Sequence, residues 1–279
     1  MSQTGSVIIS LAYRSVEDAM KITILIRAGL LLVILGLGVE VLAMSKLTVR
    51  SSPVPEVTLT NFNEDTFPEL EQTFKLPGAS GTQAAAVVVT NTSNRKIMGI
   101  AVVWVYTDEL GHQTHRSLRC DSFSSLPQRP VALPHSRLLV TPTFMLPESQ
   151  AISGSYLAAV TGAQQQIAAV AKSVAVSAEL DLVIFEDGEV AGPDQRNHIS
   201  QIEAHRAAAS AIIQQLHAET DDAAVTTILS QLASIRPDAG DYVRTAQRRI
   251  AQRLLRSRNL QRDIETLQQL PSLPKFYRR

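Results

Sequence analysis

The 279-residue sequence has little of what usually indicates chemistry. Cys120 is its one cysteine, so no internal disulfide can form, and burial and hydrogen bonding have to hold the fold. A lone free thiol is more often a small buried hydrophobic residue than a nucleophile, and we interpret Cys120 in that way. The sequence also lacks a Gly-x-Ser-x-Gly elbow, a phosphate-binding Gly-rich loop, a His-Glu-x-x-His motif and a Cys-x-x-Cys pair. We therefore predict no catalytic residue, no cofactor and no metal ligand, which favours a protein that is not an enzyme.

An excess of charge of one sign is also missing. The chain has 26 basic and 26 acidic residues, so its composition indicates no polyanionic partner for the chain as a whole. The charges are unevenly spread, because residues 241–279 hold ten Lys or Arg and three Asp or Glu, whereas residues 56–71 hold five acids and no base. Hydrophobic residues make up 45% and charged residues 19%, which is typical of a globular protein.

One long hydrophobic run is present, near the start of the chain. Residues 28–45 carry a single charge, Glu40, and have Lys and Arg on both sides. As a membrane anchor, residues 22–44 would form a helix of about 35 Å, enough to cross a hydrocarbon core of about 30 Å. As a signal peptide, residues 28–39 would be the apolar core, with cleavage after Ala43.

Both alternatives have the same consequence for location. Residues 22–45 would be a signal peptide or an inner-membrane anchor, and the residues after 45 would lie in the periplasm or at the cell surface. Residues 1–21 would be a cytoplasmic extension or the result of a mis-assigned start, because a leader beginning at Met20 has ordinary proportions. Contact with the membrane is thus predicted through residues 22–44.

The middle of the chain is rich in strand signals. Residues 46–55 are predicted as a linker, since their prolines favour extended backbone. Between residues 56 and 193, short β-favouring runs alternate with Pro, Gly, Asn, Asp and Ser. The strongest pair is 84–90 and 97–107, joined by the turn 91–94, and the second run is dense in β-branched residues around Trp104. A further run, 181–191, turns at an Asp-Gly pair. This spacing predicts an antiparallel β-sandwich over residues 56–193, with Trp104 in its core.

Two segments of this region resemble uncharacterised exported bacterial proteins with an Ig-like domain. Residues 89–97 are similar to a strand–turn–strand unit of those proteins, and residues 181–194 are similar to their final β-hairpin. Together the two segments cover 23 residues. The resemblance implies an Ig-like β-sandwich, and it implies no activity and no catalytic residue.

Residues 194–279 are predicted to be a helical tail. Apolar residues recur there with the 3.6-residue period of a helix, a second helix begins at Asp221, and a third runs from about 241 to 270. Each helix has an apolar face that needs cover, which predicts packing on the sandwich, self-association or a protein partner. The expected fold class is α+β: an antiparallel Ig-like β-sandwich, then a C-terminal α-helical region, with an N-terminal transmembrane or signal helix.

The third predicted helix carries arginines that could contact an anionic surface. They are Arg244, Arg248, Arg249, Arg253, Arg256 and Arg262. Lipid headgroups, an envelope polymer or an acidic partner would suit them. The alternative is a solvated amphipathic face whose arginine stems cover apolar surface, which is favoured because the arginines are spread around the helix. Nucleic acid is not expected, since an exported chain rarely meets it and the helix lacks aromatic residues for base stacking.

Other polar groups are interpreted as ordinary surface. The turn region 108–115 holds two acids and two histidines, but strand positions three apart face opposite sides, which argues against a metal site. His198 and His205 share a helix face two turns apart and are interpreted as surface histidines. The acids of the hairpin tip 186–189 are typical of an exposed turn.

Three functions remain open from the sequence. The favoured one is a non-catalytic binding or scaffold protein of the cell envelope, with the helices as its docking surface. The alternative is an extracytoplasmic hydrolase whose site is assembled from distant residues such as His115, Asp121 or Glu148. A third is a membrane-tethered regulator that signals through residues 1–20.

Overall fold

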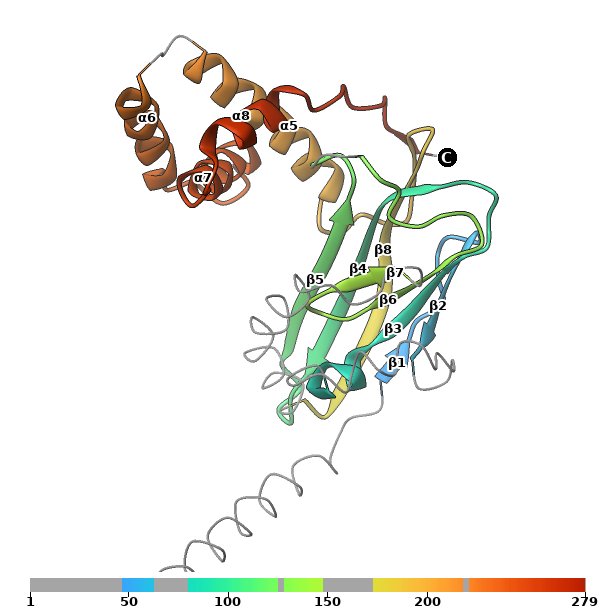
Figure 1. The fold of residues 1–279 in the computed structure, drawn as a ribbon. Coiled ribbons are helices and arrows are strands. Elements are labelled where there is room, and N and C mark those ends of the chain that lie inside the picture. Colours follow the sequence, from blue (N-terminus) through green and yellow to red (C-terminus); the bar gives the residue numbers. More distant parts are fainter. Residues whose placement is uncertain (1–46, 63–79, 125–127, 148–172, 218–220, 279) are drawn as a thin grey trace, which may run out of the picture. The chain divides into compact units, whose positions relative to one another are not determined.

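Two β-sheets and a group of helices make up the part of the protein that the structure describes (Figure 1). The computed structural model describes residues 47–62, 80–124, 128–147, 173–217 and 221–278, all of which belong to one compact unit, Lys46–Arg279. The apolar stretch 22–44, the extension 1–21 and Glu148 lie outside the described residues.

The larger sheet has six strands, and its centre is the pair β4 and β8. The strands are β1 (Leu47–Val49), β4 (Ile97–Thr107), β5 (Gln113–Asp121), β8 (Ala175–Phe185), β9 (Glu189–Ala191) and β10 (Tyr277–Arg278). They follow the order β10-β9-β8-β4-β5, and β1 pairs with β8 outside that path. β4 is buried along almost its whole length, which suits its run of β-branched and aromatic residues.

The smaller sheet has four antiparallel strands and covers one face of the larger one. It consists of β2 (Val57–Asn61), β3 (Val87–Asn91), β6 (Arg137–Val140) and β7 (Met145–Pro147), in that order, and the 3₁₀ helix η2 (Ser80–Ala85) precedes β3.

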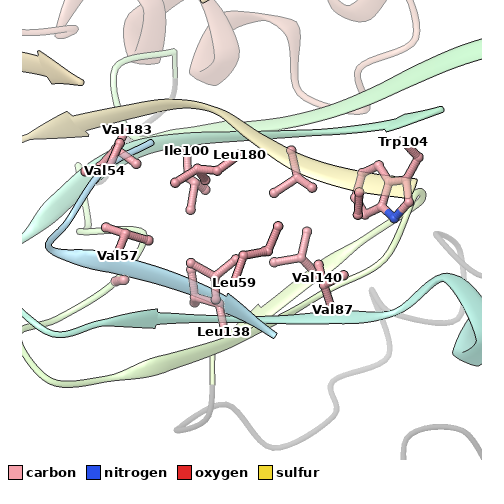
Figure 2. Close-up of a cluster of buried hydrophobic side chains, with 14 of the residues drawn as sticks. Val54, Val57, Leu59, Val87, Ile100, Trp104, Leu138, Val140, Leu180 and Val183 are labelled. Carbon is pink, nitrogen blue, oxygen red and sulfur yellow. The ribbon is translucent and has the colours of Figure 1, made fainter. Parts of the chain in front are cut away.

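The core between the sheets is mainly aliphatic, with three aromatic side chains, Trp104, Tyr106 and Phe185. Figure 2 shows side chains from both sheets pointing into it, including Val57 and Leu138 from the smaller sheet and Ile100 and Leu180 from the larger one. Trp104 is fully buried there, and its indole Nε1 donates a hydrogen bond of 2.8 Å to the carbonyl of Ala85. The prediction that Trp104 lies in the core is confirmed.

Four α-helices follow β9 in the described part of the chain: α5 (His198–Leu216), α6 (Asp222–Ser234), α7 (Tyr242–Leu255) and α8 (Leu260–Gln268). Side-chain caps set three of the starts, because Asp221, Asp241 and Asn259 each accept a hydrogen bond from a backbone N–H of the first turn. The helices share a buried cluster that includes Ile212, Leu229, Ile250 and Leu267.

The chain then returns to the larger sheet (Figure 1). β10 pairs with β9, and Phe276 packs edge-on against Phe123 with ring centroids 5.6 Å apart. Phe123, Ile202 and Leu182 belong to a second apolar cluster on the outer face of the larger sheet. The start of α5 and the last residues of the chain thus cover that face together.

The prediction of an antiparallel Ig-like β-sandwich is wrong. The larger sheet is mixed, because β1 pairs with β8 in parallel and β10 pairs with β9 in parallel. The region after residue 193 is also more than a helical tail, since its last residues form a strand of that sheet. Parallel partners are far apart in the sequence, and turn signals report only adjacent antiparallel strands.

The predicted N-terminal transmembrane or signal helix finds no counterpart among the described elements. No helix within the described ranges is long and apolar enough to cross a bilayer, and residues 22–44 are not among them. The predicted linker 46–55 is in part a strand, β1, and Val54 within it is 1% exposed.

Smaller predictions also need correction. The single helix expected over 241–270 is two helices, because the chain leaves helical geometry after Arg256 and Asn259 caps a new helix. Cys120 is exposed rather than buried, since it lies on the edge strand β5. His198 is not a surface histidine, because only 3% of it is exposed.

Candidate functional site

A pocket of about 280 Å³ lies where the edge of the larger sheet meets the helices. Its walls come from β5, from α5, and from α7 with the loop that precedes it. Its lining residues are Arg119, Gln201, His205, Asp238, Ala239, Gly240, Tyr242, Thr245, Ala246 and Arg249.

Strand register directs Arg119 into this pocket. Arg119 lies opposite Ala101 of β4, and side chains opposite each other across two strands share one face of the sheet. Ala101 packs with Ile202 of α5, so Arg119 lies on the face that α5 covers. The guanidinium Nη1 donates to the carbonyl of His198 at 3.3 Å and to Oε1 of Gln201 at 3.5 Å. These contacts hold the cation against the helix.

Helical spacing places the other polar groups. Gln201 and His205 are four residues apart on α5, and Tyr242, Thr245 and Arg249 recur at intervals of three and four on α7, so each set lies on one side of its helix. The hydroxyl oxygen of Tyr242 accepts a hydrogen bond of 3.3 Å from the side-chain amide of Asn197. Its own hydrogen is therefore free to be donated to a ligand.

The pocket has more positive than negative charge around it. Arg119 forms an ion pair of 3.2 Å with Asp121, but in the described residues no carboxylate lies within salt-bridge distance of Arg249 or Arg253. The carboxylate of Asp121 is further occupied by two backbone N–H groups and the hydroxyl of Ser124. Asp238 is the one acid that lines the pocket, and it is exposed.

Burial and the positive charge around the pocket change the pKa of His205. Burial, and after it the charge of Arg253, lower the pKa of its imidazole below the usual value, against a smaller opposite effect of Asp121. This shift favours the neutral form of the ring. Its Nε2 atom is buried and makes no hydrogen bond in the described structure. Unpartnered buried nitrogen atoms cost free energy, so the pocket has unused hydrogen-bonding capacity.

The structure brings few of the six predicted arginines together. All six are exposed, but Arg249 alone among them lines the pocket, and the charge of Arg253 acts on His205 from nearby. Arg244 forms an ion pair of 3.5 Å with Asp241 at the start of α7. The others point to solvent elsewhere: Arg248 and Arg256 on α7 and its C-cap, and Arg262 on α8.

Arg119, Gln201 and His205 were not among the predicted site residues. Arg119 is 82 residues from Gln201 in the sequence, so no local pattern joins them. The available signal was the polar side of α5, where Gln201 and His205 are one turn apart.

A second polar cluster lies under the start of α5 and is structural. Asp181 is 1% exposed, accepts hydrogen bonds from the backbone N–H groups of Gln195 and Arg196 at 2.8 and 3.3 Å, and lies 3.4 Å from Nε2 of His198. Burial by itself would raise the pKa of Asp181, but these contacts outweigh it and lower the pKa. Asp194 caps α5 by accepting the N–H of His198 at 2.6 Å. The cluster fastens α5 to the sheet.

Three acids of the turn 108–115 and the hairpin tip 186–189 also have structural partners. Asp108 accepts the backbone N–H groups of Leu110 and His112, which closes the turn between β4 and β5. At the hairpin tip, Asp187 and Glu189 form ion pairs with Arg95 at 3.2 and 2.8 Å. Among the described residues, no group of three His, Cys, Asp or Glu side chains could hold a metal ion.

No family model, no curated protein and no solved structure matches this chain. The resemblance to exported Ig-like proteins implied export and a bacterial origin, and both therefore stay predictions. The site holds two arginines, hydroxyl and amide groups, an imidazole and one exposed carboxylate, and its arginines and donors suit the binding of an oxyanion.

Proposed function

We propose that this protein is an exported, non-catalytic binding or scaffold protein of the bacterial cell envelope, which takes an oxyanion group of an envelope component in the arginine-lined pocket. The single observation that carries the ligand is the convergence of Arg119 and Arg249 on one pocket, with Arg253 nearby. Arg119 is paired with Asp121, but Arg249 has no carboxylate partner among the described residues. Arginine suits phosphate and carboxylate because its planar donors match their oxygens.

The location rests on the sequence alone. The apolar stretch 22–44 would carry the rest of the chain across the inner membrane, as a cleaved signal peptide or a lasting anchor. The helices would provide the docking or self-association surface, and nucleic acid is not a partner. A reporter enzyme fused to the C-terminus that folds only outside the cytoplasm should be active, and activity of a cytoplasm-specific reporter instead would overturn the location.

No observation favours the alternative hydrolase. The structure does not bring His115 or Asp121 into the pocket, and Glu148 lies outside the described residues. Within the described part of the site, His205 makes no hydrogen bond from Nε2 to a hydroxyl that it could activate.

The binding proposal can be tested with inorganic phosphate as the probe. Titration calorimetry on the full chain, in a non-ionic detergent and at low salt, should show saturable binding. Arg249→Gln should weaken it about tenfold, the loss expected for one charge-assisted hydrogen-bond partner. Arg248→Gln is the matched control, because it removes the same charge from the same helix outside the pocket. Equal weakening by both variants, or no binding by the wild type, would overturn the pocket assignment.

A further inference from the structure

A second, larger hollow of about 460 Å³ is lined by another part of α5. It lies between α5, α8 and the segment that leads from α8 back toward the sheets, and its volume falls within the range of small-molecule sites. None of the residues that line the 280 Å³ pocket lines this hollow. The two sites can therefore be tested separately.

The walls of the hollow are mainly apolar. The apolar residues that line it are Ala207, Ala209, Ile213, Leu267, Leu270 and Leu273. Its polar residues are a single cation, Arg206, and the uncharged Ser210, Gln268 and Ser272. An apolar wall with one cation and several uncharged hydrogen-bonding groups is complementary to an amphiphile with one negative charge.

Arg206 has no anionic partner of its own. Its guanidinium Nη1 reaches the carbonyl of Phe123 at 3.5 Å, and in the ranges that the structure describes no carboxylate lies within salt-bridge distance of it. The residue is partly buried, and this burial lowers the pKa of its guanidinium. A cation that is partly withdrawn from water without a counter-charge is unfavourable, so a ligand that supplies the counter-charge is favoured.

We propose that this hollow binds a single-chain amphiphile, whose carboxylate pairs with Arg206 and whose alkyl chain lies along Ile213, Leu267 and Leu273. A single alkyl chain fits the apolar lining, and a carboxylate matches the planar fork of one guanidinium. Ser210 and Ser272 add hydroxyl groups that can bond the same carboxylate.

Photo-crosslinking of the full chain tests this proposal. The protein is placed in nanodiscs of uncharged phospholipid and exposed to dodecanoate that carries a diazirine on its chain, and labelled peptides are located by mass spectrometry. Labels should map to α5 around Ile213 and to residues 267–273. The affinity of unlabelled competitor fatty acids should rise with chain length, up to about fourfold for each methylene that the hollow can bury.

Variants separate the hollow from general adsorption. Arg206→Gln and Ile213→Trp should each lower the labelling at least fivefold, the first by removing the cation and the second by filling the hollow. Arg248→Gln, an exposed arginine outside the hollow, should leave it unchanged. The matching neutral alcohol should label at least tenfold less. Scattered labels, equal labelling by the alcohol, or labelling that survives both variants in folded protein would overturn the proposal.

Discussion

The paired sheets and the helical layer differ in how they treat charge. Around the sheets, Arg50, Arg95 and Lys96 all have carboxylate partners within 3.2 Å. On the helices, Arg206 and Arg249 have no such partner in the described part of the chain, and each lines a pocket. The two regions thus separate two tasks. The sheets enclose an apolar core, and these three cations beside them are neutralised, whereas Arg206 and Arg249 on the helices are cations that a ligand can use.

The largest loss of stability should follow from emptying the core between the sheets. Trp104→Ala removes a fully buried side chain and leaves the carbonyl of Ala85 without its 2.8 Å donor. The free energy of unfolding should fall by about 3–5 kcal/mol in denaturant titrations. Leu110→Ala is the control, because Leu110 is 80% exposed, and it should change the free energy by less than about 0.5 kcal/mol. A small effect of Trp104→Ala would show that the core is not the source of stability.

The next largest effect should come from separating the two regions. Asp181→Asn removes the charge that accepts the N–H groups of Gln195 and Arg196 and that faces His198, so the start of α5 loses its attachment to the sheet. We expect a loss of about 3 kcal/mol, because two backbone N–H donors lose a charged acceptor. Hydrogen exchange should then rise in α5 more than in β4, and an even rise in both would contradict this role.

Lowering the pH should also destabilise the protein through Asp181. The folded-state pKa of Asp181 is lowered, so its stabilisation is complete above the unfolded-state pKa of about 3.8 and is lost as the pH falls through the folded-state pKa. Between about pH 5 and pH 2, the free energy of unfolding should fall more steeply in the wild type than in Asp181→Asn. Parallel curves for the two proteins would show that Asp181 does not carry this pH dependence.

The strands of the larger sheet differ in how far the sequence could predict them. The expected strand 97–107 matches β4, and the hairpin around Asp187 is present, because alternation and turn chemistry are local signals. The partners of β1 and β10 were not predictable in this way. β10 is two residues long, and β1 pairs with a strand that begins 126 residues after β1 ends at Val49. Only the tertiary structure brings such short segments into a sheet.

The candidate site was predictable to a smaller extent. Arginines on the helix near the C-terminus were recognised by charge, yet charge alone did not show that Arg249 lines a pocket and Arg248 does not. The difference depends on which side of α7 faces the pocket, the side that holds Tyr242, Thr245 and Arg249, and this is set by tertiary packing. Buried ring atoms such as Nε2 of His205 leave no trace in a sequence pattern.

A smaller loss of stability is expected at Gly192, where the backbone passes close to the backbone of Asp181. Gly192 has φ +98°, and a Cβ there would lie 2.7 Å from the carbonyl oxygen of Asp181. Gly192→Ala should therefore cost about 2 kcal/mol through combined strain and crowding. Gly111 has a similar φ of +81° with no atom within 4 Å, so Gly111→Ala should show the strain alone, about 1 kcal/mol. Equal thermal shifts for the two variants would remove the argument for crowding.

The smallest predicted difference in stability is between variants of two arginines, one with carboxylate partners and one without. Arg95 lies 3.6 Å from the ring centroid of Phe185 and pairs with Asp187 and Glu189, whereas Arg248 is exposed on α7 without a carboxylate partner in the described structure. Arg95→Met should cost about 1.5 kcal/mol, because partly exposed ion pairs add little individually and the ring contact adds about 1 kcal/mol. Arg248→Met should change the free energy of unfolding by less than about 0.5 kcal/mol.

High salt should reduce the difference in free energy of unfolding between the two variants, since it screens the ion pairs but not the ring contact. If Arg248→Met were as costly as Arg95→Met, an exposed arginine without a carboxylate partner would stabilise the fold as much as a paired one, and the contrast between the two kinds of arginine would not hold.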